Sequence, residues 1–277
     1  MNLRRLSART AAAGVTAALA AGALVGLGAT SADAATASNV YTCKVDLLSV
    51  SFDTTLSATG EIPLPSAPAG YPVDAGLISL SVTASIDPAF APTLGQYGVT
   101  SAKADDFGLT MGKGFVPVPV AGNIVTSGSA VSWQATGKNT AFNLPGAGNP
   151  SATLPSKFTF IAASSFGDVP IPCTLKAGET PQSLGSIALA KQGTKTTAKV
   201  AKGKLTATVK GDASAATSGQ VVVLDGKKVV GKGNVKNGKA VIKLKKLKKG
   251  THKLVASFKG NDAFGASKAK AVKVVVK

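Results

Sequence analysis

The sequence predicts an all-β protein built from two β-sandwich domains behind an N-terminal export signal. Three observations support this prediction in a chain of 277 residues with a formal net charge of +18. Short runs that alternate apolar and polar residues are separated by turns rich in Gly and Pro. The charge changes sign between two segments, and both cysteines lie in the first segment.

The first 34 residues have the features of a cleaved signal peptide. Arg4, Arg5 and Arg9 precede the apolar run from Ala11 to Leu27, and "SADAATA" offers a small-residue cleavage site after Ala34. The apolar run is short and consists largely of Ala and Gly, which disfavours a membrane anchor. We expect a secreted, extracellular protein, free or associated with the cell wall, with no transmembrane anchor in the mature chain.

The charge distribution indicates where the mature chain divides. Residues 35–190 contain six lysines and nine acidic residues, whereas residues 191–277 contain 22 lysines and three acidic residues. Two segments of opposite charge are expected to be separate units. We predict a disulfide-closed sandwich of unknown role at 38–178, a linker at 179–192 and a lysine-rich domain at 193–277.

Cys43 and Cys173 nearly bracket the first domain. In an exported protein, two cysteines are expected to form a disulfide rather than remain free or bind a metal ion. The pairing predicts that the first and last strands of this domain are neighbours. Closing a loop of this length would restrict the unfolded chain by roughly 5 kcal/mol in the chain-entropy model.

Strands are expected throughout the first domain, because Ser and Thr alternate with apolar residues between Pro- and Gly-rich turns. No run has the periodicity of a helix. The candidate strands are "YTCKVDLLSVSFDTTLSATG", "GLISLSVTASID", "AVSWQATG", "SKFTFIAAS" and "VPIPCTL".

The lysine-rich segment "KAVIKLKKLKKGTHKL" at 239–254 predicts two strands with a lysine-rich turn rather than an amphipathic helix. Asn237-Gly238 is a strong hairpin-turn dipeptide, and Gly250 limits the run on its other side. Asp225-Gly226 predicts a further hairpin, and the terminal "AVKVVVK" predicts a last strand. Apolar residues keep a period of two on both sides of Gly250: Ala240, Ile242, Leu244, Leu254, Ala256 and Phe258.

A set of motifs is spread over Thr194 to Lys277. The motifs are "SGQVVV" at 218–223, Asn237-Gly238, Leu247 with "GTH" at 250–252, and "KGND" at 259–262 followed by Phe264 and Ser267. With these motifs the segment resembles the bacterial immunoglobulin-like repeats of surface and secreted proteins, and the resemblance implies an immunoglobulin-like sandwich that acts as a spacer, stalk or adhesive unit. The first domain, with "YTC" at 41–43 and "PIPC" at 170–173, resembles an uncharacterised family of secreted actinobacterial domains without known activity.

The lysines of the second domain have two open interpretations: a solvated outer face, or a surface that binds anionic wall polymers or the envelope surface. Nucleic acid is not expected as a partner, because every arginine lies in the predicted signal peptide and no aromatic platform is evident. The sequence does not predict the oligomeric state. The candidate contacts for an anionic polymer are Lys243, Lys245, Lys246, Lys248 and Lys249.

No catalytic, cofactor or metal constellation stands out, so we expect a protein that is not an enzyme. His252, the sole histidine, shares the phase of apolar positions and is expected to be structural. Trp133 alternates with Val131 and Ala135, which predicts a core residue or, alternatively, a platform for an apolar ligand or glycan. The favoured function is non-enzymatic interaction or adhesion at the cell envelope; the alternative is an extracellular carrier. A hydrolase based on paired carboxylates is disfavoured.

Overall fold

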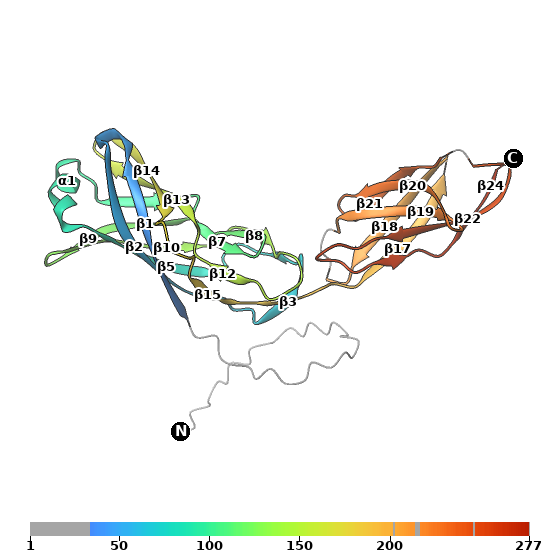
Figure 1. Cartoon of the computed structure of the whole chain (residues 1–277), viewed down its shortest axis with the longest axis horizontal. Coiled ribbons are helices and arrows are strands. Elements are labelled where there is room, and N and C mark those ends of the chain that lie inside the picture. The colour runs from blue at the N-terminus through green and yellow to red at the C-terminus, as the bar shows by residue number, and fades with distance from the viewer. Residues whose placement is uncertain (1–33, 202, 214–216, 246, 277) are drawn as a thin grey trace, which may run out of the picture. The chain divides into compact units, whose positions relative to one another are not determined.

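The computed structural model describes residues 34–201, 203–213, 217–245 and 247–276. These residues form an all-β protein, as the sequence predicts, in two domains (Figure 1). The predicted signal peptide lies outside the described residues, except for Ala34. No helix within the described ranges is long and apolar enough to cross a membrane.

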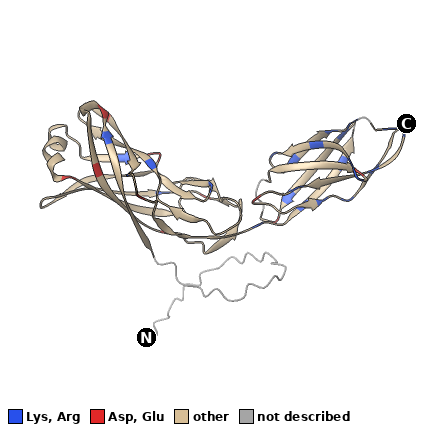
Figure 2. Cartoon of the chain, viewed as in Figure 1, with Lys and Arg blue, Asp and Glu red and all other residues tan. Residues whose placement is uncertain are grey.

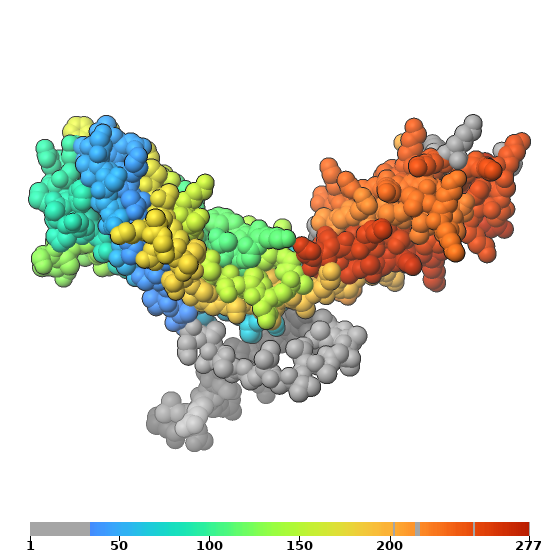
Figure 3. Space-filling view, viewed as in Figure 1, coloured from blue at the N-terminus to red at the C-terminus, as the bar shows by residue number. Residues whose placement is uncertain are grey.

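The first domain is organised around a closed barrel of eight strands in the order β1-β14-β13-β6-β9-β10-β5-β2. All neighbouring strands in the barrel are antiparallel. In Figure 3, the blue residues of β1 and β2 lie beside the yellow residues of β13 and β14. The strands are β1 (Ala35–Val45), β2 (Val50–Glu61), β5 (Ser79–Ile86), β6 (Ser101–Ala104), β9 (Val120–Ser127), β10 (Ala130–Lys138), β13 (Lys157–Ser164) and β14 (Gly167–Leu175).

Alternating residues of these strands fill the barrel interior. Along β5 every second side chain is buried, and the same alternation runs through β10 around Trp133. Successive side chains of a strand point to opposite faces, so one face of each strand supplies the core. The sequence alternation that predicts these strands therefore also identifies their inward positions.

The structure refines the prediction of a two-sheet sandwich for this domain. The short strand β6 pairs with β9 on one side and with β13 on the other, and these pairings close the sheet. An alternating pattern indicates one buried face but does not show whether the outermost strands pair with each other. Closure leaves the main sheet without an open edge.

Smaller sheets extend the barrel, and two of their strands lie in the predicted linker at 179–192. These two strands are β15 (Ser183–Ser186), which pairs with β12, and β16 (Ala188–Ala190), which pairs with β3. Buried Leu184, Ile187 and Leu189 explain why this segment packs on the first domain. The other small strands are β3 (Ser66–Pro68), β4 (Pro72–Val73), β7 (Gly108–Met111), β8 (Gly114–Pro117), β11 (Phe142–Asn143) and β12 (Ser151–Thr153).

The predicted disulfide is present between Cys43 of β1 and Cys173 of β14. The two cysteines are directly opposite each other in the antiparallel register. Nearby, the buried Tyr41 hydroxyl donates a hydrogen bond of 2.7 Å to the carbonyl of Pro155, and burial raises the pKa of this phenol. The first and last strands of the barrel segment are therefore neighbours, as the cysteine spacing predicts.

Two short helical segments, absent from the sequence prediction, lie between β5 and β6. They are η2 (Pro88–Phe90) and α1 (Ala91–Gln96), and a third one-turn segment, η1 (Asp46–Leu48), joins β1 to β2. The carboxylate of Asp87 accepts a hydrogen bond of 2.9 Å from the backbone N–H of Ala89, which caps the start of η2. Six residues are too few to produce a detectable helical period.

The second domain is a sandwich of two sheets, as the immunoglobulin-like resemblance implies. One sheet has the order β17-β18-β21; the other has the order β20-β19-β22-β23, with β24 also paired to β22. Leu205, Val223, Ile242, Leu254 and Phe258 fill the core between the sheets. The strands are β17 (Thr194–Ala201), β18 (Lys204–Gly211), β19 (Gly219–Asp225), β20 (Lys228–Val235), β21 (Lys239–Lys243), β22 (Gly250–Phe258), β23 (Ser267–Lys268) and β24 (Val272–Val276).

The lysine-rich segment forms strands with the predicted phase. Ala240 and Ile242 of β21 are buried, and Leu254, Ala256 and Phe258 of β22 are buried. The two strands belong to different sheets, so the lysine-rich residues between them cross from one sheet to the other. Figure 2 shows lysine positions on several strands of this domain.

Candidate ligand-binding site

A cavity of about 290 Å³ opens at one end of the barrel in the first domain. Its walls come from the ends of β1, β5 and β13, from the β1–β2 turn, and from η2 and α1. None of the side chains that line it is charged. A barrel of eight strands has room either for its own side chains or for one small ligand.

Small residues at inward positions create this space. Ala84 of β5, Ala102 of β6 and Ala162 of β13 are all buried and line the cavity. Larger aliphatic side chains at these positions would fill the volume that the alanines leave open. The cavity thus exists because three different strands each place an alanine, with only a methyl side chain, at an inward position.

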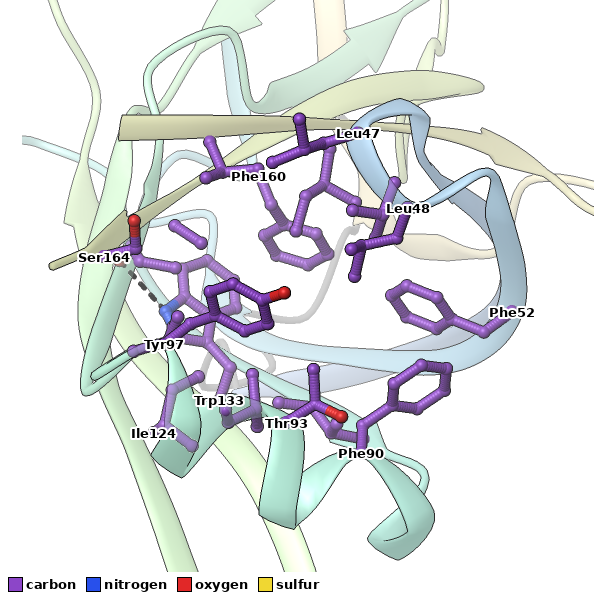
Figure 4. Close-up of a pocket in the computed structure, with 18 of the residues that line it drawn as sticks. Leu47, Leu48, Phe52, Phe90, Thr93, Tyr97, Ile124, Trp133, Phe160 and Ser164 are labelled. Atoms are coloured by element: carbon purple, nitrogen blue, oxygen red, sulfur yellow. Dashed lines mark hydrogen bonds between the residues drawn. The ribbon is translucent and has the colours of Figure 1, made fainter. Parts of the chain in front are cut away.

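Trp133 forms part of the cavity wall. Its ring packs edge-to-face against Phe160, with the ring centroids 4.8 Å apart. The indole N–H donates a hydrogen bond of 3.0 Å to the carbonyl of Ala102 (Figure 4). Because this polar group is satisfied by the backbone, the indole offers its apolar ring atoms to the cavity.

Two further aromatic pairs line the cavity. The ring centroids of Phe52 and Phe90 lie 5.1 Å apart, and those of Tyr97 and Phe166 lie 6.0 Å apart. Figure 4 shows Phe52, Phe90 and Tyr97 around an open centre, with the Tyr97 hydroxyl directed inward. Aromatic walls of this kind give a large apolar contact area at low conformational cost.

Four hydroxyl groups are the polar groups of the lining side chains besides the indole N–H. Thr54 donates to the carbonyl of Ser85, and Ser164 donates to the carbonyl of Gly167 at 2.7 Å. Within the described part of the chain, the hydroxyls of Thr93 and Tyr97 make no hydrogen bond with another residue. A ligand could therefore find its polar partner on α1 or just after it.

Large apolar side chains surround the mouth of the cavity. Leu47 is 76% exposed, Leu48 is 38% exposed and Phe166 is 82% exposed. Leu47 and Leu48 belong to the turn between β1 and β2, whereas Phe166 lies in the turn between β13 and β14. We call these three residues the apolar rim.

Trp133 is a core residue, and its predicted role as a platform for a ligand stays a prediction. It is only 2% exposed and contacts the core, and it also lines the cavity. The other lining residues are absent from the sequence prediction. Two leucines in "DLLS" and a phenylalanine in "SSFG" are unusual in turns, and they were the available signal for the mouth.

The predicted lysine contacts are on the surface of the second domain. Lys243, Lys245, Lys248 and Lys249 are exposed, and Lys246 lies outside the described residues. The four lie at the end of β21 and in the connection that follows it. Their exposure is compatible with both interpretations, a solvated face and an anion-binding surface.

Both ring nitrogens of His252 are held by hydrogen bonds within the second domain. Its Nδ1 atom lies 2.6 Å from the carboxylate of Asp225, and its Nε2 atom lies 2.9 Å from the carbonyl of Lys248. These hydrogen bonds, first to the Lys248 carbonyl and then to Asp225, raise the pKa of the imidazole. Since both ring nitrogens are engaged, neither is available as a general base. Among the described residues, no group of three or more His, Cys, Asp or Glu is placed to hold a metal ion.

Comparison with known proteins supports the resemblance of the second domain. Residues 187–277 match the family model of the bacterial Ig-like domain (group 3). No curated protein matches the chain. The immunoglobulin-like domain indicates a surface-associated protein.

Two of the solved structures that match the chain are distant from it. A putative membrane anchored protein from Corynebacterium diphtheriae is 14% identical with a TM-score of 0.34, and the match covers 88% of this chain and 59% of that one. A β-glucuronidase from Ruminococcus gnavus is 10% identical with a TM-score of 0.19, and the match covers 88% of this chain and 43% of that one. At these TM-scores, neither structure informs the function of this chain.

Proposed function

We propose that this chain is a secreted, non-catalytic binding protein that holds a small apolar ligand in its first domain. The observation that carries the proposal is the uncharged cavity of about 290 Å³ beside Trp133. Small-molecule sites are typically apolar concavities of about 300–1,000 Å³ with a few polar groups, and the volume of this cavity is just below that range. The extracellular location rests on the signal peptide predicted from the sequence.

The walls define the chemistry of the ligand. An ionised group inside the cavity would lose its hydration without gaining an opposite charge, so the enclosed part of the ligand is neutral. The hydroxyls of Thr93 and Tyr97 offer one or two hydrogen bonds to a carbonyl or hydroxyl group. The ligand is therefore a small apolar molecule with aromatic or aliphatic character and at most one or two polar atoms.

The same lining supports a non-catalytic role. The side chains around the cavity provide no carboxylate, imidazole or amine to act as an acid or base on a bound molecule. Incubating the mature chain with a panel of wall-derived substrates tests this part of the proposal. Hydrolysis that disappears when a single carboxylate is replaced would contradict it.

Fluorescence energy transfer provides a test of ligand binding. Trp133 is the sole tryptophan, and diphenylhexatriene is a neutral apolar molecule that accepts energy from indole. We expect saturable transfer at one molecule per chain, since the lining places the probe beside the ring. In the variant Ala162→Leu, the added side chain occupies the cavity, and we expect transfer to fall at least about tenfold. Equal transfer in both chains would contradict the proposal.

A second candidate function is attachment of the basic domain to anionic wall polymers. It is favoured by the 22 lysines and three acidic residues of residues 191–277. Lysine side chains hold polyanions by charge without requiring a fixed geometry. Co-sedimentation of the chain with purified cell walls over a salt series tests this function: we expect binding at low salt and release once the screening length falls below about 8 Å. Replacing Lys243, Lys245, Lys248 and Lys249 by Gln should weaken binding at low salt.

A further inference from the structure

The apolar rim is unusual because its side chains are exposed and also line a cavity. Phe166 is separated by more than 100 positions in sequence from Leu47 and Leu48, yet all three line the same mouth. Other exposed apolar side chains of the described residues, such as Leu77 at 45% and Val275 at 62%, do not line this cavity. The rim is therefore a local concentration of apolar surface at the entrance, not a general property of the surface.

The route of the ligand explains why such a rim would form. A neutral molecule that fits the cavity is poorly soluble in water and accumulates in lipid layers. A protein that takes it directly from a lipid layer avoids transfer through water. Leucine and phenylalanine on turns are suited to the boundary between headgroups and acyl chains, where they need no matching shape.

The positive charge of the second domain favours a lipid surface with negatively charged headgroups. Residues 191–277, which include the second domain, carry 22 lysines against three acidic residues. A cluster of lysines is attracted to anionic headgroups within about one Debye length of the surface. Attraction of this kind concentrates the chain at an anionic lipid layer, and the rim supplies the contact that is independent of charge.

We propose that Leu47, Leu48 and Phe166 insert into an anionic lipid surface and that the cavity exchanges its apolar ligand with that surface. This inference rests on the proposed ligand-binding function. The rim and the cavity have separable roles in it: the rim contacts the lipid, and the cavity beyond it holds the ligand.

Flotation with ligand-free vesicles tests the rim without involving the cavity. The probe is a vesicle of phosphatidylcholine and phosphatidylglycerol, and the protein is the chain that begins at Ala35. We expect the variant with Leu47→Asp and Phe166→Asp to partition at least about tenfold less than the unmodified chain at high salt, where attraction by lysine is screened. The matched control Leu77→Asp changes an exposed leucine near the start of β5, the opposite end of that strand from the cavity-lining Ile86, and should partition within about twofold of the unmodified chain.

The variant Ala162→Leu distinguishes failure of this inference from failure of the proposed function. It should lose energy transfer to diphenylhexatriene and still float with vesicles, whereas the rim variant should lose flotation. Equal flotation of the rim variant and the unmodified chain would overturn the inference, while binding of diphenylhexatriene in solution would leave the proposed function intact. Three other results would also overturn the lipid inference. They are flotation that depends only on salt, binding to wall polymers but not to vesicles, and formation of a dimer through the apolar rim without vesicles.

Discussion

The two domains use the same type of secondary structure and differ in where their unusual residues lie. The first domain has a small excess of acidic residues, nine against six lysines, and leaves a cavity inside, because Ala84, Ala102 and Ala162 occupy inward positions. The second domain fills its core with larger residues such as Ile242 and Phe258 and carries its excess of lysines on the outside. The comparison teaches that the two proposed functions use different features: an internal cavity whose shape selects the ligand in the first domain, and an external lysine surface whose charge attracts a polyanion in the second.

Removing the disulfide should cause the largest loss of stability among these tests. The loss should be confined to the first domain, which distinguishes the two domains. With Cys43→Ser and Cys173→Ser, we expect the free energy of unfolding of the first domain to fall by roughly 5 kcal/mol or somewhat less, because the unfolded chain gains entropy. Trp133 emission during urea unfolding reports on this domain alone, since the chain has no other tryptophan. An unchanged Trp133 transition in the variant would show that the disulfide does not stabilise the barrel.

A cavity made in the filled core should affect only the second domain. Phe258 is fully buried, and Phe258→Ala should cost about 3–5 kcal/mol of its stability. The measurement is loss of amide hydrogen-exchange protection in β19 and β22, and the Trp133 transition should stay in place. As a control, the exposed Val275→Ala should cost within about 0.5 kcal/mol. A shift of the Trp133 transition by Phe258→Ala would contradict the independence of the two cores.

A ligand should stabilise the first domain and not the second. At a free concentration of 100 times its Kd, a ligand that binds only the folded barrel adds about 2.7 kcal/mol by mass action. We expect diphenylhexatriene to raise the temperature of the Trp133 transition and to leave protection in β22 unchanged. In Ala162→Leu this shift should disappear. A ligand-dependent shift that survives in this variant would place the ligand outside the cavity.

The smallest expected effect is the dependence of the stability of the second domain on pH. Hydrogen bonds to the Lys248 carbonyl and to Asp225 raise the pKa of His252 above 6.5 in the folded domain. Its stabilising contribution is therefore fully present below pH 6.5 and is lost as the pH rises through the folded pKa. Unfolding measured from about pH 5 to about pH 9 should show this decline, and Asp225→Asn should flatten it. A second domain that becomes more stable over this range would contradict the assignment.

Alternation in the sequence was sufficient to locate the barrel strands β1, β2, β5, β10, β13 and β14 and the phase of the lysine-rich segment, but not the short strands. The pairing of Cys43 with Cys173 also follows from sequence, because a chain with two cysteines and a predicted export signal has one possible intramolecular bridge. Closure of the barrel could not be predicted, since β6 has only four residues and pairs with strands far away in the sequence. The two strands in the predicted linker were missed for the same reason: short segments pair according to their tertiary context.

The cavity could not be predicted from the sequence, because an inward alanine and an inward valine give the same alternating pattern of apolar and polar residues. Ala162 in "KFTFIAAS" looks like any other apolar position of a strand, and its small size matters only when the opposite wall is known. Trp133 was the one residue of the site that the sequence singled out. Its role at the wall of a cavity depends on the alanines of neighbouring strands, which a single sequence does not place in contact.

The indole N–H signal of Trp133 in a nuclear magnetic resonance titration tests the central claim most directly. This group donates a hydrogen bond to the Ala102 carbonyl at the wall of the cavity, and the chain has only one indole. We predict that a neutral apolar ligand such as diphenylhexatriene shifts this signal until one molecule is bound per chain, while the amide signals of β21 and β22 stay unchanged. An indole signal that does not move while amides of the second domain do would contradict the account.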